Sequence, residues 1–189
     1  MAILDLELMD MGGLLSLLEQ TGDLLAQKNA DAILDTNAVT SQYGLTLTRE
    51  DVVKLLNTRD RALADNDRIE LGQGVIDRII LAFCDSPYLN CTNYADTLCA
   101  LTELFYYMKN DTLDQMPDDE LIQRMKEYFN GEDKGSLELL AGRELEQMAR
   151  NIRTYGTPDA PEEPQPPVQV DDSGEYLIEE DGQWRTLQL

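Results

Sequence analysis

The sequence predicts an all-α fold, a bundle of five or six helices around a central helical hairpin. Through most of the first 155 residues, apolar side chains recur every three or four positions, which is the period of an α-helix. The clearest case is residues 72–110, where an apolar helix, the turn Asp85-Ser86-Pro87 and a second apolar helix follow without a linker. Such helices belong inside a domain, because each is apolar over a wide face. The defining residues are Val75, Ile76, Ile79, Ile80, Phe83, Tyr94, Leu98, Leu101, Phe105 and Met108.

Ahead of this hairpin, the chain contains signals for two further helices. Residues 1–27 alternate at first and then adopt a helical pattern, so this segment stays ambiguous. Asn29 is a suitable N-cap for a helix that ends near Gly44, since glycine tolerates the left-handed backbone after a helix. Thr48 followed by Asp51 resembles a capping box and predicts a helix through about residue 65. Arg59 falls on its apolar stripe and needs a partner if it is buried.

Two more helices are expected after the hairpin. Pro117 and the acids that follow it open one helix, which Gly131 ends, because proline is tolerated in the first turn and carboxylates complement the helix dipole. Ser136 is expected to cap the last helix. Gly142 lies inside the apolar stripe of that helix and suggests a close helix contact there. The stripe comprises Leu137, Leu140, Ala141, Leu145, Met148 and Ile152.

The composition divides the chain into a helical domain at 1–155, a disordered acidic proline-rich linker at 156–174 and a possible β-hairpin at 175–189. Asp181-Gly182 is typical of a two-residue hairpin turn. Pairing across it places Tyr176 opposite Leu187 and Ile178 opposite Arg185. Two strands alone are marginally stable in water, so the hairpin needs something to pair with.

Charge and residue usage exclude several functions. The formal net charge is −22, with nine acids and one base after residue 154, which disfavours binding to nucleic acid or anionic membranes. The chain contains no histidine, the commonest general base and metal ligand. Cys84, Cys91 and Cys99 lack the spacing of a zinc site and are expected to remain reduced thiols. We therefore expect no metal and no cofactor. The acidic N-terminus is unlike a secretory signal, and a cytoplasmic location is expected.

Four stretches carry a family resemblance: RDRAL from Arg59, RIELGQGVIDRIILAFCDSPYL from Arg68, NYADTL from Asn93 and GSLELLAGRELEQMARNIR from Gly135. Together they resemble an uncharacterised domain-of-unknown-function family of Gram-positive (Firmicutes) bacteria, over roughly residues 30–153. The resemblance implies a small cytoplasmic bacterial protein. It implies no activity, cofactor or catalytic residue.

Three groups of side chains are candidate sites. Asp85, Ser86 and Tyr88 form either a structural turn or a ligand-facing loop at a helix end. Ser136 and Arg143 could grip a carboxylate or phosphate at a helix N-terminus. In the tail, Tyr176, Ile178, Trp184 and Leu187 are apolar residues that could bind a partner.

Other charged residues have a structural interpretation first. Charges beside the apolar stripes could meet as an inter-helix ion network. The acidic clusters are expected to be solvated helix starts, although paired carboxylates for hydrolysis stay open as an alternative. The first set comprises Arg59, Glu70, Asp77, Arg143 and Glu144, and the second comprises Asp111, Asp114, Asp118, Asp119 and Glu120.

These observations favour a non-catalytic interaction or adaptor protein that binds an unknown protein partner through its tail. One alternative is a histidine-free enzyme that uses carboxylates. Another is an acidic mimic of nucleic acid that occupies the basic groove of a binding protein.

Overall fold

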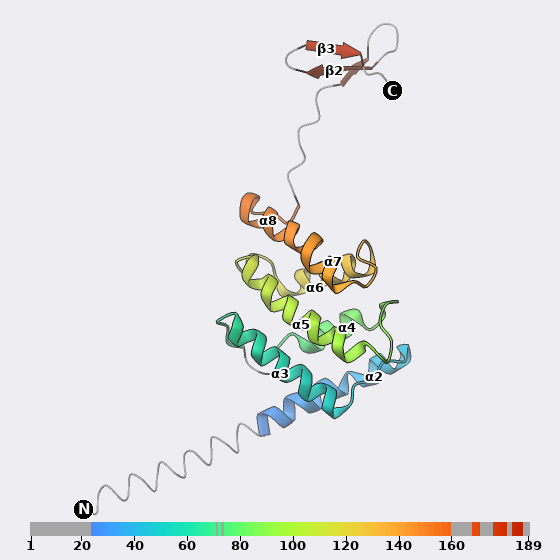
Figure 1. Ribbon diagram of the computed structural model, residues 1–189, viewed down its shortest axis with the longest axis vertical. Helices are drawn as coiled ribbons and strands as arrows, with labels where there is room; N and C mark the ends of the chain where they lie inside the picture. Colours follow the sequence, from blue (N-terminus) through green and yellow to red (C-terminus); the bar gives the residue numbers. More distant parts are fainter. Residues whose placement is uncertain are drawn as a thin grey trace, which may run out of the picture.

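The computed structural model describes residues 24–70, 72 and 74–159, together with the backbone of three strands between residues 168 and 186 (Figure 1). The fold is all-α, as the sequence predicts. Among these residues, six helical segments are present when pieces that continue one another are joined. They are residues 24–35 with α2 (Asn37–Thr40) and a 3₁₀ turn (Ser41–Tyr43); α3 (Arg49–Asp65); α4 (Ile76–Phe83); α5 (Tyr94–Asp111); α6 (Asp118–Asn130); and α7 (Leu137–Leu139) with a π-helix (Leu140–Leu145) and α8 (Glu146–Tyr155).

The predicted hairpin forms the centre of the core. In Figure 1, α5 lies between α3 on one side and the last helical segment on the other, and α4 packs against α5 and α6. The ring of Phe83 on α4 meets that of Phe129 on α6 edge to face, with centroids 5.6 Å apart. Burial of such large side chains supplies most of the driving force for folding. The largest fully buried side chains include Ile33, Leu55, Ile76, Ile79, Ile80, Phe83, Tyr94, Leu98, Leu101, Phe105, Met108 and Phe129.

The helix ends follow local chemistry in α3. Thr48 Oγ1 accepts a hydrogen bond from the Asp51 amide at 3.2 Å, and Asp51 Oδ2 accepts one from the Thr48 amide at 2.8 Å, so the predicted capping box is confirmed. The Thr48 hydroxyl also donates to Asp51 Oδ2 at 2.6 Å, and this bond, together with that from the Thr48 amide, holds the pKa of Asp51 below its ordinary value because both stabilise the carboxylate. Gly44 ends the preceding segment with a φ of +74°.

Two details of the expected helices are wrong. Asn29 does not cap a helix, because residues 24–30 are already helical and Asn29 lies within them. Gly142 does not mark a close helix contact, because it is exposed and an added Cβ would meet nothing within 4 Å. Gly142 lies within the π-helix at Leu140–Leu145, whose wider turns interrupt the 3.6-residue period on which the prediction for Gly142 rests.

The helical part continues a little beyond the expected boundary at Tyr155. The Asn151 side chain donates to the carbonyl of Pro158 at 3.0 Å, and Arg124 pairs with Asp159 at 3.1 Å. Residues 156–159 therefore belong with the helices. Within the described residues, no helix has the length and apolar character that a membrane crossing requires.

After residue 167 the described backbone forms a three-stranded antiparallel sheet, drawn beyond α8 in Figure 1. β2 (Tyr176–Glu180) pairs with β3 (Gln183–Thr186), and Ile178 lies opposite Arg185 as the hairpin turn predicts. The expected partner of Tyr176, Leu187, lies outside the described residues. β1 (Val168–Val170) pairs with the other side of β2, within the segment that the composition assigns to the linker.

Candidate functional site

The loop between α4 and α5, the first candidate site, is attached to α6 by all three of its candidate residues. Asp85 pairs with Lys126 at 2.9 Å. The buried Ser86 hydroxyl donates to Asn130 Oδ1 at 2.5 Å. The half-buried Tyr88 ring packs edge to face on Phe129, 6.2 Å between centroids, and also lies against Gly135. The loop geometry therefore supports a structural turn.

Gly135 is required where Tyr88 meets the α6–α7 connection. Its φ is +81°, and an added Cβ would lie 2.5 Å from Tyr88 Cβ, which no side chain can tolerate. This close approach fixes Tyr88 between α6 and the start of α7. Nearby, Ser136 Oγ accepts from the Leu139 amide at 3.3 Å and caps α7 as expected.

Arg143, the other half of the expected anion grip, lies among carboxylates instead of beside Ser136. Its guanidinium is 2.7 Å from Glu144, 3.7 Å from Glu132 and 3.9 Å from Asp133. A hydrogen bond with Glu144 raises the pKa of Arg143, so the side chain stays cationic. No hydrogen bond joins Ser136 to Arg143 among the described residues, and an incoming anion would have to compete with three acids for this cation.

Asp133 is the one group in this cluster with an unusual environment. It is 1% exposed, and neither carboxylate oxygen has a hydrogen-bond partner in the described part of the chain. Burial raises the pKa of its carboxyl, and the neighbouring Glu144 adds to this, while Arg143 opposes it. Nothing in the sequence distinguishes Asp133 from the exposed acids around it, so its burial could not be predicted.

An ion network does join several segments, but its members differ from those expected. Lys109 on α5 is 7% exposed, and its ammonium contacts the Met116 carbonyl at 2.7 Å, Asp118 at 3.0 Å and Asp114 at 3.3 Å. Asp118 also pairs with Arg78 of α4 at 3.0 Å. The network thus connects α4, α5 and the start of α6. Of the acidic clusters, Asp118 and Asp119 are the first residues of α6, and both pair with Arg78.

The expected set divides into separate contacts. The buried Arg59 pairs with its neighbour Asp60 at 2.6 Å and donates to the Gly72 carbonyl. Glu70 accepts a hydrogen bond from the buried Tyr106 hydroxyl, and burial, reinforced by this carboxylate, raises the pKa of Tyr106. These contacts fix the chain before α4 against α3 and α5. The prediction that Arg59, Glu70, Asp77, Arg143 and Glu144 form one network is wrong.

The three cysteines carry free thiols. Cys84 and Cys99 are buried, Cys91 is exposed, and none of the three forms a disulfide in the structure. Burial raises the pKa of both buried thiols, which keeps them neutral and unreactive. Among the described residues, no three carboxylates or thiols lie close enough together to hold a metal ion.

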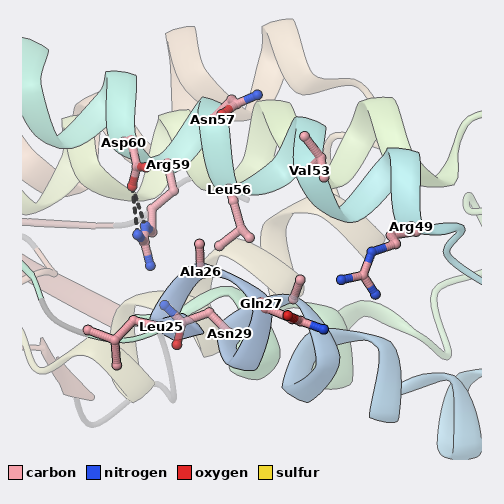
Figure 2. Close-up of a pocket in the computed structure, with 11 residues that line it drawn as sticks. Leu25, Ala26, Gln27, Asn29, Arg49, Val53, Leu56, Asn57, Arg59 and Asp60 are labelled. Carbon is pink, nitrogen blue, oxygen red and sulfur yellow. Dashed lines mark hydrogen bonds and ion pairs between the residues drawn. The ribbon is translucent and has the colours of Figure 1, made fainter. Parts of the chain in front are cut away.

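One concave surface in the described part of the chain is an open groove of about 680 Å³ between residues 24–35 and the outer face of α3 (Figure 2). Leu56 points across it, and Leu25 and Val53 are 56% and 49% exposed. In Figure 2 the Arg59–Asp60 pair lies at one end of the groove and Arg49 lies toward the other. The lining is mixed, with five apolar and six polar or charged residues, and its two arginines pair with Asp31 and Asp60.

The sheet supplies a second candidate surface. The register places Val168 opposite Ile178 and Val170 opposite Tyr176. Directly opposed residues of antiparallel strands belong to the same face of a sheet, so these four apolar residues share one face. Trp184, opposite Glu179, belongs to the other face. The sheet order is β1-β2-β3, so β1 and β3 are its two edges. The sequence had indicated the hairpin but not β1, because a run of three residues among prolines and acids carries little strand signal.

The profile of one protein family matches the chain over residues 32–158, and its description reads "Family of unknown function (DUF6323)". The matched residues run from the helix before α2 to the residues just after α8. This agrees with the resemblance found in the sequence over residues 30–153. No curated protein and no solved structure matches the chain.

Proposed function

Since the chain belongs to the DUF6323 family, whose function is unknown, we propose from its geometry that it is a non-catalytic interaction protein that presents a short sheet to a protein partner. The observation that carries this proposal is the strand register. It gathers Val168, Val170, Tyr176 and Ile178 on one face of a sheet of only three strands. Apolar residues on a surface of this kind are typical of binding sites for other proteins.

The charge of the tail defines the chemistry of the partner. The last 35 residues contain nine acids and one base, so the apolar face is carried on a strongly negative segment. A complementary surface would have an apolar patch with basic residues around it, because opposite potentials steer association and suppress wrong partners. The edges β1 and β3 could also add to a strand of the partner, as extended peptides do in β-augmentation.

The contacts of the helical part are consistent with a supporting role. Several of its polar groups pair with one another: Asp85 with Lys126, Ser86 with Asn130 and Lys109 with Asp118. These bonds attach loops to helices and rigidify the domain on which the tail is displayed. The proposal places the protein in the cytoplasm, where three free thiols would stay reduced.

The test is capture of partners from cells that contain the native protein, with tagged full-length chain as bait. Ile178→Asp puts a charge on the apolar face, and Thr186→Asp puts the same charge on the other face as a matched control. We expect Ile178→Asp to weaken binding of the captured partner about thirtyfold, the effect of losing a hot spot worth about 2 kcal/mol. Thr186→Asp should bind within about twofold of the unchanged protein, since it lies on the opposite face.

Two salt concentrations separate this proposal from its alternatives. A partner held through the apolar face stays bound at high salt, whereas a partner of an acidic mimic is released, because exposed ion pairs are screened. Equal binding by both variants, or release of the partner at high salt, would contradict the proposal. Melting curves of both variants should match that of the unchanged protein and show that the helical part is intact.

A further inference from the structure

The connection between α6 and α7 (residues 131–136) combines a buried acid, a strained turn and a close contact with the α4–α5 loop. We propose that this connection is a pH-sensitive switch, in which loss of the Asp133 proton opens the connection locally and releases Tyr88. The inference does not depend on the proposed function, because it concerns the helical part of the chain and not the sheet.

In the closed connection, backbone hydrogen bonds hold Asp133 in place. Its amide donates to the Tyr128 carbonyl at 3.1 Å, and its carbonyl accepts from the Ser136 amide at 2.9 Å. With the backbone fixed in this way, the side chain is buried, and neither carboxylate oxygen has a hydrogen-bond partner in the described part of the chain. An ionised carboxylate in such a site loses its hydration without replacement. Ionisation therefore favours any state in which Asp133 reaches water.

The charged groups around Asp133 do not compensate for this loss. Arg143 on the π-helix is 3.9 Å away and already pairs with Glu144 at 2.7 Å. Glu144 and Glu132 are acids and oppose ionisation of the carboxyl. The other titratable side chains of the segments that meet here are those of Lys134, which is exposed, and of Tyr88 and Tyr128, whose phenols carry no charge near neutral pH.

The closed turn is also strained, which lowers the cost of opening it. Lys134 has a φ of +48°, in the left-handed region that favours glycine. Two further backbone bonds close the turn: the Lys134 amide donates to the Gly131 carbonyl at 3.4 Å, and the Gly135 amide donates to the Phe129 carbonyl at 2.7 Å. A short segment with few hydrogen bonds can open without unfolding of the whole domain.

Tyr88 is coupled to the connection through its contact with Gly135. An added Cβ at Gly135 would lie 2.5 Å from Tyr88 Cβ, so the two segments touch with no space between them. The ion pair of Asp85 and the hydrogen bond of Ser86 attach the other end of the loop to α6 itself. Opening of the connection therefore frees the Tyr88 end of the loop and leaves the Asp85 and Ser86 contacts in place.

The direction of the pH dependence follows from the burial of Asp133. Burial raises the pKa of its carboxyl, Glu144 adds to this, and Arg143 opposes it. A protonated carboxyl stabilises the closed connection below the ordinary pKa of aspartate, and this stabilisation is lost as the pH rises through the raised value of the closed state. The connection should therefore open more often at about pH 7 than at about pH 4.

Amide hydrogen exchange of the full-length protein, followed residue by residue by NMR, tests the switch. The protection factor of the Gly135 amide, which is corrected for the intrinsic effect of pH on exchange, should fall at least about fivefold between about pH 4 and about pH 7. The Leu89 amide, next to Tyr88, should follow it. The Ser86 amide, which donates to the Phe83 carbonyl at 3.0 Å, is the internal reference and should not. Equal protection of Gly135 relative to Ser86 at both pH values would overturn the proposal, and equal protection of Leu89 would overturn the release of Tyr88.

Two variants assign the effect to Asp133. Asp133→Asn keeps the shape of the side chain but cannot ionise, so the protection factor of Gly135 should agree within about twofold at the two pH values. Glu132→Gln is the matched control. It removes the neighbouring acid, whose side chain is 78% exposed, and should keep the pH dependence of the unchanged protein. A pH dependence that survives Asp133→Asn, or one that disappears in Glu132→Gln, would overturn the proposal.

Discussion

Lys109 and Asp133 are both buried ionisable side chains, 7% and 1% exposed, but they differ in the number of polar partners around their charged groups. The Lys109 ammonium has three oxygen partners within 3.3 Å from three positions of the chain. The Asp133 carboxylate has no hydrogen-bond partner among the described residues, and the nearest cation, Arg143, is 3.9 Å away.

The difference shows how a buried charge can either stabilise or strain a small helical domain. Removing an ion from water costs several kcal/mol, which only close partners can offset. Around Lys109 that offset comes from the turn after α5 and the first residue of α6, so the charge fixes the direction of the chain between them. Around Asp133 no close partner offsets the cost of removing the charge from water, and burial raises the pKa of its carboxyl for the same reason.

The largest expected effect is at Lys109. Lys109→Met keeps the apolar stem but removes the charge, which leaves the Met116 carbonyl without its donor and takes one of two cations from each of Asp114 and Asp118. We expect the free energy of unfolding to fall by about 3 kcal/mol, as when one partner of a buried pair is removed. Lys54→Met is the matched control. Its pair with Asp96 is exposed on both sides, so the loss should stay below about 1 kcal/mol. Urea unfolding of both variants gives the comparison, and equal losses would show that burial of Lys109 adds nothing.

The same cluster sets a dependence on pH. Burial opposes ionisation of Asp118, but its bonds to Lys109 and Arg78 outweigh this and lower the pKa of its carboxyl. The bonds of Asp114 to Arg68 lower its pKa as well. A lowered folded pKa adds stability above the ordinary pKa of aspartate that is lost as the pH falls through the folded value. The unfolding free energy should therefore fall below about pH 4, and fall less steeply in Lys109→Met.

Replacing Asp133 is expected to raise the free energy of unfolding, by less than the loss expected at Lys109. Because its folded pKa is raised, the carboxyl contributes favourably when protonated, and this contribution is lost as the pH rises through the folded value. Asp133→Asn removes the charge and should stabilise the protein by about 1 kcal/mol at pH 7, but not at pH 4. Glu132→Gln is the control, since its side chain is 78% exposed beside the same arginine. Destabilisation of Asp133→Asn at pH 7 would indicate that the carboxylate has a partner after all.

The last variant tests whether a buried neutral pair behaves like the buried charges. Ser86→Ala removes the donor to Asn130 and should lower the unfolding free energy by about 1 kcal/mol, without changing capture of the tail's partner. Ser41→Ala, on an exposed side chain, should change stability by less than about 0.5 kcal/mol. Loss of partner capture at unchanged stability would instead assign the α4–α5 loop to the binding site.

The sequence predicted the features that depend on neighbours along the chain. The helical period located the hairpin core, and the residues around Thr48 located the start of α3, because side-chain caps involve groups within three residues. It also predicted that Ser136 caps a helix and that Ile178 faces Arg185. Each of these features is decided within a few residues.

The features that the sequence did not reveal depend on how turns and helices pack in three dimensions. Lys109 lies on the buried face of α5, but its partners Met116 and Asp118 approach it only through the turn after that helix. Asp133 is buried in the connection between α6 and α7, and no pattern of acids signals this. The groove along α3 exists because two helices meet at an angle that periodicity does not specify. These features are therefore products of the tertiary structure.

The π-helix at Leu140–Leu145 has a consequence for how this chain can change in length. A π-turn holds one residue more than the α-turn it replaces, so it can absorb an insertion without rotating the helix after it. Loss of one residue, such as the exposed Gly142, would convert the segment to an uninterrupted α-helix and leave Met148 and Ile152 of α8 facing the core. The helix α5 contains no π-turn, so loss of one residue from it would rotate every later side chain of that helix by about 100°.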